Sequence, residues 1–197
     1  SGQTLDEFLR DRIFKPLGMT DTHYYVPLEK IDRVAAVYRP RDDGTIELRK
    51  APMFVEPTKY FRGVAGLRST ASDYYRFAQM IANGGELEGT RILGRMTVNN
   101  MITNQIGALP VDVRGEGYGF GLGFGILTNP AKAVDALSAG SYTWGGAYGT
   151  LYWADPVEDL IGILLIQIRP YTHFNIRPMF SNVVTQAVID SLGDQRP

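Results

Sequence analysis

Hydrophobic residues recur at helical spacing near the start of the chain, and residue signals mark both ends of the stretch. The apolar positions Leu5, Phe8, Leu9 and Ile13 are three or four residues apart or adjacent, as on one face of a helix. Thr4 and Glu7 have the spacing of a capping box, in which each residue satisfies the backbone N–H of the other. Pro16 and Gly18 follow, and neither continues a helix well. The pattern therefore predicts a helix that begins after Thr4.

Three later stretches have the same helical period. One helix is predicted to begin at Thr70, with Asp73 in its first turn, and to stop at the Asn-Gly-Gly run 83–85. A shorter one covers 95–103, and a last one covers 176–192. We expect the last helix to turn its apolar residues inward, namely Met179, Val183, Val184, Ala187 and Val188.

Alternating positions predict strands in the remaining chain. Short strands are expected at 34–38 and 46–48, around a turn at 42–44. In residues 117–126, glycine alternates with large apolar residues, so one face of a strand would carry hydrogen only. This run has neither of the glycine spacings of phosphate-binding loops. It predicts one strand that another backbone covers closely.

Three more strands are predicted at 141–147, 149–154 and 159–168, joined by short turns. Strands joined in this way are usually antiparallel neighbours. With the helices, they predict an α+β fold, in which an antiparallel sheet has flanking helices.

Composition narrows the class of protein without naming a function. The 197 residues carry a net charge of −1 and include 44% hydrophobic and 21% charged residues, as soluble globular domains do. This balance supplies no basic face for nucleic acid. The longest apolar run, Leu160 to Ile168, is too short to span a membrane. Cysteine is absent, which excludes disulfides and thiolate chemistry, and the start at Ser1 without Met suggests a processed, trimmed or subcloned piece.

The chain offers little catalytic chemistry of its own. His23 and His173 have no partners at metal-ligand spacing, so we expect no zinc or other metal site. We expect no cofactor of another kind either. The paired carboxylates at 42–43 and 158–159 lie beside turn signals, where solvated turns explain them better than acid–base catalysis. No serine has Lys three residues later or lies in a G-x-S-x-G motif, whether Ser1, Ser69, Ser72, Ser138, Ser141, Ser181 or Ser191.

The run 144–150, Trp-Gly-Gly-Ala-Tyr-Gly-Thr, is the most informative stretch. Glycines leave main-chain N–H groups accessible, and bare N–H donors at a strand edge suit a developing oxyanion. The same glycines also fit a tight hairpin inside a twisted sheet.

Several motifs, taken together, resemble the serine β-lactamase-like family, which includes class C β-lactamases, DD-peptidases and family VIII carboxylesterases. Their order and spacing match along nearly the whole chain, at residues 13–22, 66–73, 77–78, 83–85, 117–121, 144–146 and 155–156. The resemblance implies that residues 1–197 are the C-terminal portion of one β-lactamase/transpeptidase-like domain. The N-terminal strands and the nucleophile helix would lie upstream of Ser1.

The family's acyl-enzyme mechanism uses three motifs, and the resemblance places only the third in this chain, at Trp144-Gly145-Gly146. Ser-x-x-Lys and Tyr-x-Asn have no counterpart here. Trp144 stands where β-lactamases carry Lys or His, which is more similar to the family VIII esterases. An indole offers one N–H donor and no positive charge. The resemblance also implies that the Ala147 N–H is an oxyanion donor whose partner is the N–H of the absent serine.

The predicted site therefore has two groups of residues. The catalytic group is Ala147 with Trp144 and Gly146 of the third motif, and the substrate-binding group is Gly145, Tyr148, Tyr118 and Phe120. Each aromatic residue of the second group fits core packing equally well.

Two hypotheses about function follow. In the first, the chain is the C-terminal part of a serine hydrolase for small esters or β-lactam-like amides, and its partner is the missing N-terminal half of the fold. In the second, it is a non-catalytic ligand-binding module or an inactive fragment. A bare sheet edge would favour self-association in either case. The compartment stays open between bacterial cytoplasm and periplasm.

Overall fold

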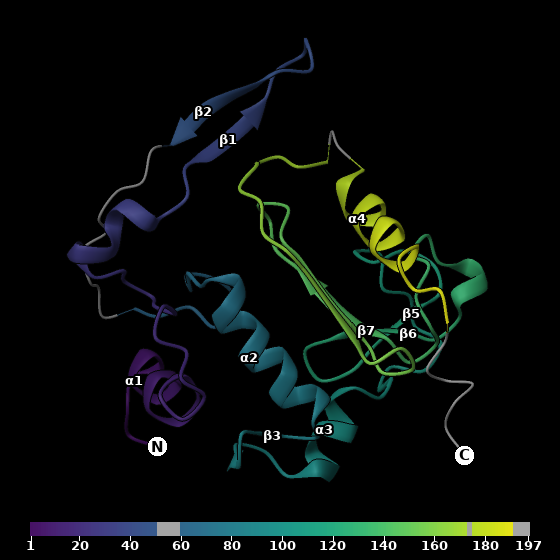
Figure 1. Cartoon of the computed structure of the whole chain (residues 1–197), viewed down its shortest axis with the longest axis horizontal. Coiled ribbons are helices and arrows are strands. Elements are labelled where there is room, and N and C mark those ends of the chain that lie inside the picture. Colours follow the sequence, from purple (N-terminus) through teal and green to yellow (C-terminus); the bar gives the residue numbers. More distant parts are fainter. Residues whose placement is uncertain (51–59, 173–174, 191–197) are drawn as a thin grey trace. The chain divides into compact units, whose positions relative to one another are not determined.

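The computed structural model describes residues 1–50, 60–172 and 175–190 and divides into two units, Ser1–Ile92 and Leu93–Pro197. Figure 1 shows the elements of each unit along the chain. His173 lies outside the described residues.

The first unit begins with the predicted helix. α1 (Leu5–Leu9) continues into a π-helical turn (Arg10–Phe14), and the backbone N–H of Thr4 donates to Glu7 at 3.1 Å, as in a capping box. A 3₁₀ helix (Leu28–Arg33) then leads to a hairpin of β1 (Val37–Pro40) and β2 (Ile46–Lys50). The hairpin confirms the predicted pair of strands, with bounds shifted by a few residues.

Helix α2 (Ala71–Ala82) confirms the second predicted helix. The Thr70 side chain accepts from the Asp73 N–H at 3.2 Å, which satisfies one of the free donors of the first turn. After the helix, Gly84 and Gly85 adopt positive φ angles, which end it as expected, and the short strands β3 (Glu86–Leu87) and β4 (Thr90–Arg91) follow.

The second unit begins with α3 (Arg95–Met101) and contains one antiparallel sheet. Its strands lie in chain order, and each pairs with the next: β5 (Tyr118–Phe120), β6 (Gly125–Leu127), β7 (Tyr142–Gly145), β8 (Leu151–Asp155) and β9 (Leu160–Leu164). A 3₁₀ turn (Pro130–Lys132) lies between β6 and β7. The last three strands are the antiparallel neighbours that the sequence predicts, and the α+β prediction is confirmed.

The prediction of one strand over 117–126 is wrong, because the run folds into the β5–β6 hairpin. The turn needs Gly123, whose φ is +100°, and is closed by the N–H of Gly121 donating to the Phe124 carbonyl at 2.8 Å. The predicted close backbone cover is present, since a Cβ on Gly121 would collide with the Met101 carbonyl oxygen. Alternation of glycine and apolar residues fits one strand and a tight hairpin equally well, and only the position of the turn distinguishes them.

Helix α4 (Ile176–Thr185) is shorter than the predicted 176–192, and the face that it packs on the sheet matches the predicted one only in part. Met179 and Val183 are 61% and 64% exposed, so their predicted inward orientation is wrong for this structure. Val184 contacts the buried core as predicted, and Phe180, which was not predicted to face inward, contacts it too. This core cluster is Tyr118, Leu127, Leu137, Leu151 and Trp153. The inward face of α4 begins with Arg177 and includes Ser181. A prediction from apolar residues alone puts both of these polar residues on the solvent-exposed face.

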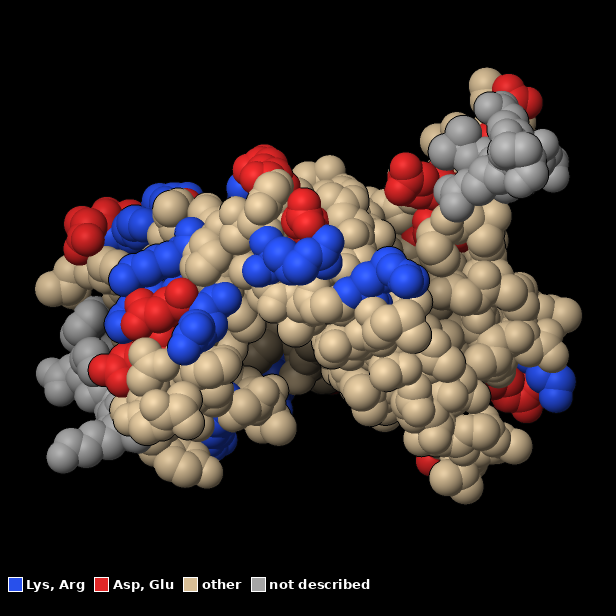
Figure 2. All heavy atoms as spheres, turned by 90° about the horizontal axis from the view of Figure 1, so that it is seen from below, with Lys and Arg blue, Asp and Glu red and all other residues tan. Residues whose placement is uncertain are grey.

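No helix in the described part of the chain is long and apolar enough to cross a membrane. On the face drawn in Figure 2, both acidic and basic side chains occur, and several lie beside a side chain of the opposite sign.

Candidate functional site

Strand β7 is paired on both edges at its start and on one edge at its end. Thr143 lies opposite Gly125 of β6 and Trp153 of β8. Trp144 and Gly145 pair with β8 alone, and the β6 register stops one residue earlier. The Thr143 hydroxyl donates to the Tyr152 carbonyl at 2.6 Å and anchors the strand where the second pairing ends. The motif strand therefore runs out from the sheet into a bare edge.

A tight turn follows β7 and connects it to β8. The N–H of Gly146 donates to the Thr150 carbonyl at 3.0 Å, and the N–H of Gly149 donates to the Gly146 carbonyl at 3.1 Å. Gly149 has a φ of +94°, a conformation that few residues other than glycine adopt. The N–H groups of Gly146 and Gly149 thus form the hydrogen bonds of the turn, and those of Ala147 and Tyr148 do not take part in them.

Arg177, from the first turn of α4, holds this turn by its carbonyl oxygens. Its Nη2 donates to Gly146 at 2.5 Å and to Thr150 at 2.8 Å, and its Nε donates to Gly149 at 3.4 Å. The guanidinium also lies 4.0 Å from the ring centroid of Tyr171 and donates to the Tyr171 hydroxyl at 2.6 Å. Burial lowers the pKa of Arg177, and the charge of Arg114 lowers it further.

These three hydrogen bonds from Arg177 to the turn, called the Arg177 clamp below, decide where the Ala147 N–H points. In a planar trans peptide the C=O and N–H point in opposite directions. The Gly146 carbonyl, in the same peptide unit, points at Arg177. The Ala147 N–H therefore points away from Arg177. Ala147 is exposed, and no hydrogen-bond acceptor for its amide occurs among the described residues.

Steric crowding explains why glycine occupies both positions 145 and 146 of the motif. A Cβ on Gly145 would lie 2.7 Å from the Arg177 Cζ, and one on Gly146 would collide with the Thr150 hydroxyl. Residues of any other type would push the clamp or the turn out of place.

Aromatic side chains surround the bare edge unevenly. Trp144 meets Phe120 of β5 edge to face, with ring centroids 5.1 Å apart. Tyr148 is partly exposed, and Arg169 lies 5.4 Å from its ring centroid. Tyr118 is 6% exposed, belongs to the buried core, and donates its hydroxyl to Asp135 at 2.6 Å. The structure therefore brings Phe120 to Trp144 and places Tyr118 in the core.

The described residues contain no serine whose hydroxyl is hydrogen-bonded to a Lys, His or Tyr side chain. Ser69 instead bonds Thr22 at 2.8 Å, and Thr22 donates to Asp73 at 2.8 Å, so this motif ties a loop to the start of α2. Within the same described residues, no three His, Asp or Glu side chains gather as metal ligands would.

Sequence reasoning missed Arg177. One signal for it was present, because a cation in the first turn of a helix opposes the helix dipole and is unfavourable there without another reason. The carbonyls of the turn supply that reason.

Comparisons with known proteins identify the family of the chain. The sequence model of the family described as Beta-lactamase matches residues 1–180. The chain is 36% identical over 180 residues to Protein Rv1367c of Mycobacterium tuberculosis and 31% identical over 183 residues to Esterase EstB of Burkholderia gladioli. Each match covers 84% of this chain and 44% of the relative, so the chain spans less than half of their length.

A solved structure shows the same fold. EstCE1, described as a hydrolase with promiscuous acyltransferase activity, superposes with a TM-score of 0.76 at 22% identity. The superposition covers 91% of this chain and 50% of EstCE1.

Proposed function

This chain belongs to the β-lactamase family, and on that premise we propose that it is the C-terminal part of a serine acyl hydrolase that works through an acyl-enzyme. One observation carries the proposal. Ala147 presents a free N–H at an exposed turn, beside Trp144 and the bare end of β7, and the Arg177 clamp fixes its direction.

In this proposal the Ala147 N–H is half of an oxyanion hole. A serine Oγ from the upstream half attacks the ester carbonyl carbon, and the carbonyl oxygen gains the negative charge. The Ala147 N–H and the N–H of that serine donate to it. The C–O bond then breaks, the alcohol leaves with a proton, and water later releases the acyl group. Donors fixed before the reaction stabilise this charge without reorganising.

Trp144 favours esters over substrates that carry a carboxylate. A Lys at this position would attract a substrate anion, whereas an indole gives an apolar wall with one donor. Phe120, packed edge to face on Trp144, and the partly exposed Tyr148 extend this wall in the proposal, and Gly145 and Gly146 let the substrate approach the backbone. The name of the relative EstB, an esterase, supports the same preference.

The proposal also assigns both units to one domain. Residues 1–197 would combine with an upstream half that carries the Ser-x-x-Lys and Tyr-x-Asn motifs, and a small ester is the proposed substrate. Self-association of the chain without that half is part of the proposal, because β9 is an edge strand of the described sheet.

The experiment compares the full-length protein with the chain alone. We expect the full-length protein to hydrolyse p-nitrophenyl butyrate faster than nitrocefin, and the isolated chain to hydrolyse neither. A fluorophosphonate should label only a serine upstream of residue 1. Labelling of a serine within 1–197 would contradict the proposal.

A proline substitution tests the donor itself. In the full-length protein, Ala147→Pro removes the N–H and should lower kcat by about 10²–10³ with KM nearly unchanged. Ala147→Ser keeps the N–H and is the matched control. Equal activity of the two variants would exclude Ala147 as the donor.

The second candidate function is a non-catalytic module. It is favoured by the described serines, none of which is hydrogen-bonded to a side-chain base. A full-length protein that binds p-nitrophenyl esters without turnover or fluorophosphonate labelling would support this candidate and reject the first.

A further inference from the structure

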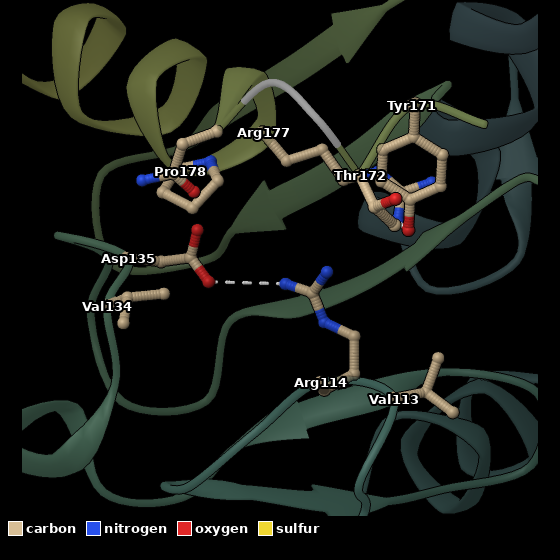
Figure 3. Close-up of a pocket in the computed structure, with 9 residues that line it drawn as sticks. Val113, Arg114, Val134, Asp135, Tyr171, Thr172, Arg177 and Pro178 are labelled. Carbon is tan, nitrogen blue, oxygen red and sulfur yellow. Dashed lines mark hydrogen bonds and ion pairs between the residues drawn. The ribbon is translucent and has the colours of Figure 1, made fainter. Parts of the chain in front are cut away.

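A cavity of about 390 Å³ lies within the second unit, on the side of the β7–β8 turn from which Arg177 reaches it. Figure 3 shows Arg114 and Asp135 facing each other across it, with Tyr171 and Arg177 above them. Val113, Val134 and Pro178 complete an apolar part of the wall. The volume is within the range of small-molecule sites.

The charges that line this cavity do not balance. Arg114 Nη2 contacts Asp135 Oδ2 at 3.2 Å, and that oxygen also accepts from the Tyr118 hydroxyl at 2.6 Å. Arg177 has carbonyl and hydroxyl partners only, and no ion pair of it occurs within the described chain. The described residues that line the cavity therefore include two guanidinium groups and one carboxylate, which leaves one positive charge uncompensated. Burial is the main cause that lowers the pKa of Arg177; Tyr171 opposes this effect, and the charge of Arg114 adds to it.

Arg114 stacks on the ring of Tyr118, whose hydroxyl also accepts from its Nη2 at 3.4 Å, but its donors are not all satisfied. Its side chain is 9% exposed, and its Nε is buried without a hydrogen-bond partner. In Figure 3 one terminal nitrogen of Arg114 meets Asp135, and the other points toward Tyr171 and Thr172. A buried donor without an acceptor is costly, and more so when it carries charge. The cavity thus has an uncompensated positive charge, on Arg177, and a donor on Arg114 that no described group accepts.

We propose that this cavity is a binding site for a small anion, a carboxylate or a phosphate, whose oxygens accept from Arg114. The planar guanidinium matches the oxygens of either group. Arg177 adds attraction without a direct bond, and the apolar wall accommodates a short hydrocarbon attached to a carboxylate. The site differs from the proposed oxyanion hole, because the Ala147 N–H points away from Arg177.

The test uses the chain itself and needs no catalytic activity. Acetate, butyrate and inorganic phosphate are titrated separately at constant ionic strength, and the side-chain Nε–H signals of the arginines are followed by NMR. We expect saturable one-to-one binding that shifts the Arg114 signal. Tighter binding of butyrate than acetate would assign the site to carboxylates with a hydrocarbon tail, and tighter binding of phosphate would assign it to phosphates.

Variants make the test specific. Arg114→Gln combined with Asp135→Asn removes the guanidinium and its charge without leaving a buried carboxylate unpaired, and it should weaken binding at least about tenfold. Arg114→Lys keeps the ion pair and should also weaken binding, so it serves if the double variant unfolds. Arg95→Gln removes an exposed charge of the same unit and should bind as the unchanged chain does.

Two results would overturn the proposal. Arginine signals that drift linearly with anion concentration would show screening alone. Equal binding by Arg114→Lys and Arg95→Gln would show that Arg114 is not the ligand. Both outcomes are independent of whether the full-length protein hydrolyses esters.

Discussion

At the scale of single residues, the site depends on two kinds of contact. Some leave no room for a side chain at the glycines of the motif, and others are hydrogen bonds from the guanidinium of Arg177. Gly145 and Gly146 have no room for a Cβ, and Arg177 contacts three carbonyls of one turn. The motif could be predicted from sequence, because glycine between aromatics is visible in the letters. The contact of Arg177 with the turn could not be predicted, because the two are far apart in sequence and come together only in the folded chain.

Gly146→Ala should destabilise the chain by about 1–3 kcal/mol, because the new Cβ would collide with the Thr150 hydroxyl. Urea unfolding gives the free energy of unfolding. Gly63→Ala is the control, since a Cβ there has no atom within 4 Å. Adding Thr150→Ala should restore part of the loss, and strictly additive effects would refute the collision.

Arg177→Lys should loosen the turn although it keeps the charge, because an ammonium cannot reach three carbonyls as a planar fork does. Amide hydrogen exchange should speed up at Gly146 and Gly149, whose N–H groups bond within the turn. The amides of α2 should exchange as before, and so should all amides of Arg95→Lys. Unchanged exchange rates at both glycines would mean that the turn is stable without the Arg177 clamp.

At the scale of elements, the sequence predicted those whose ends carry local signals. α2 begins at Thr70 and stops at glycines with positive φ, as its caps require. The 117–126 run was predicted wrongly, and the face of α4 only partly correctly. A hairpin turn and a polar inward stripe depend on distant partners such as Met101 and the β7–β8 turn. Short-range chemistry is readable in sequence, and tertiary contact is not.

The sheet should lose stability in alkali through Tyr142 of β7. Burial raises the pKa of this side chain to about 12, against an ordinary value near 10. The folded pKa is the higher one, so the stabilisation is complete below pH 10 and is lost as the pH rises toward 12. Tyr142→Phe cannot ionise. The difference in unfolding free energy between the two chains should therefore change by about 2–3 kcal/mol over this range. Parallel pH profiles would contradict the prediction, and Tyr38→Phe, at an exposed tyrosine, is the control.

At the scale of the whole molecule, the described sheet ends at β9. This strand pairs with β8 on one side, and no other described strand pairs with it. Leu165, directly after it, is 47% exposed, and Met179 and Val183 of α4 leave apolar surface uncovered in the same unit. An open strand edge beside apolar side chains is a template for pairing with another chain. The relatives are about twice as long as this chain, which is consistent with an upstream half that covers this surface.

The isolated chain should therefore self-associate, and the upstream half, when co-expressed, should replace the second copy. Light scattering after size-exclusion chromatography would measure the mass of each species. Leu165→Lys places a charge beside the edge and should shift the chain toward monomer, because like charges then meet across a β9–β9 contact. Leu28→Lys, at an exposed leucine of the other unit, is the matched control. A monodisperse monomer at high concentration would show that the edge is closed by the chain itself. Equal masses of the two variants would place the contact elsewhere.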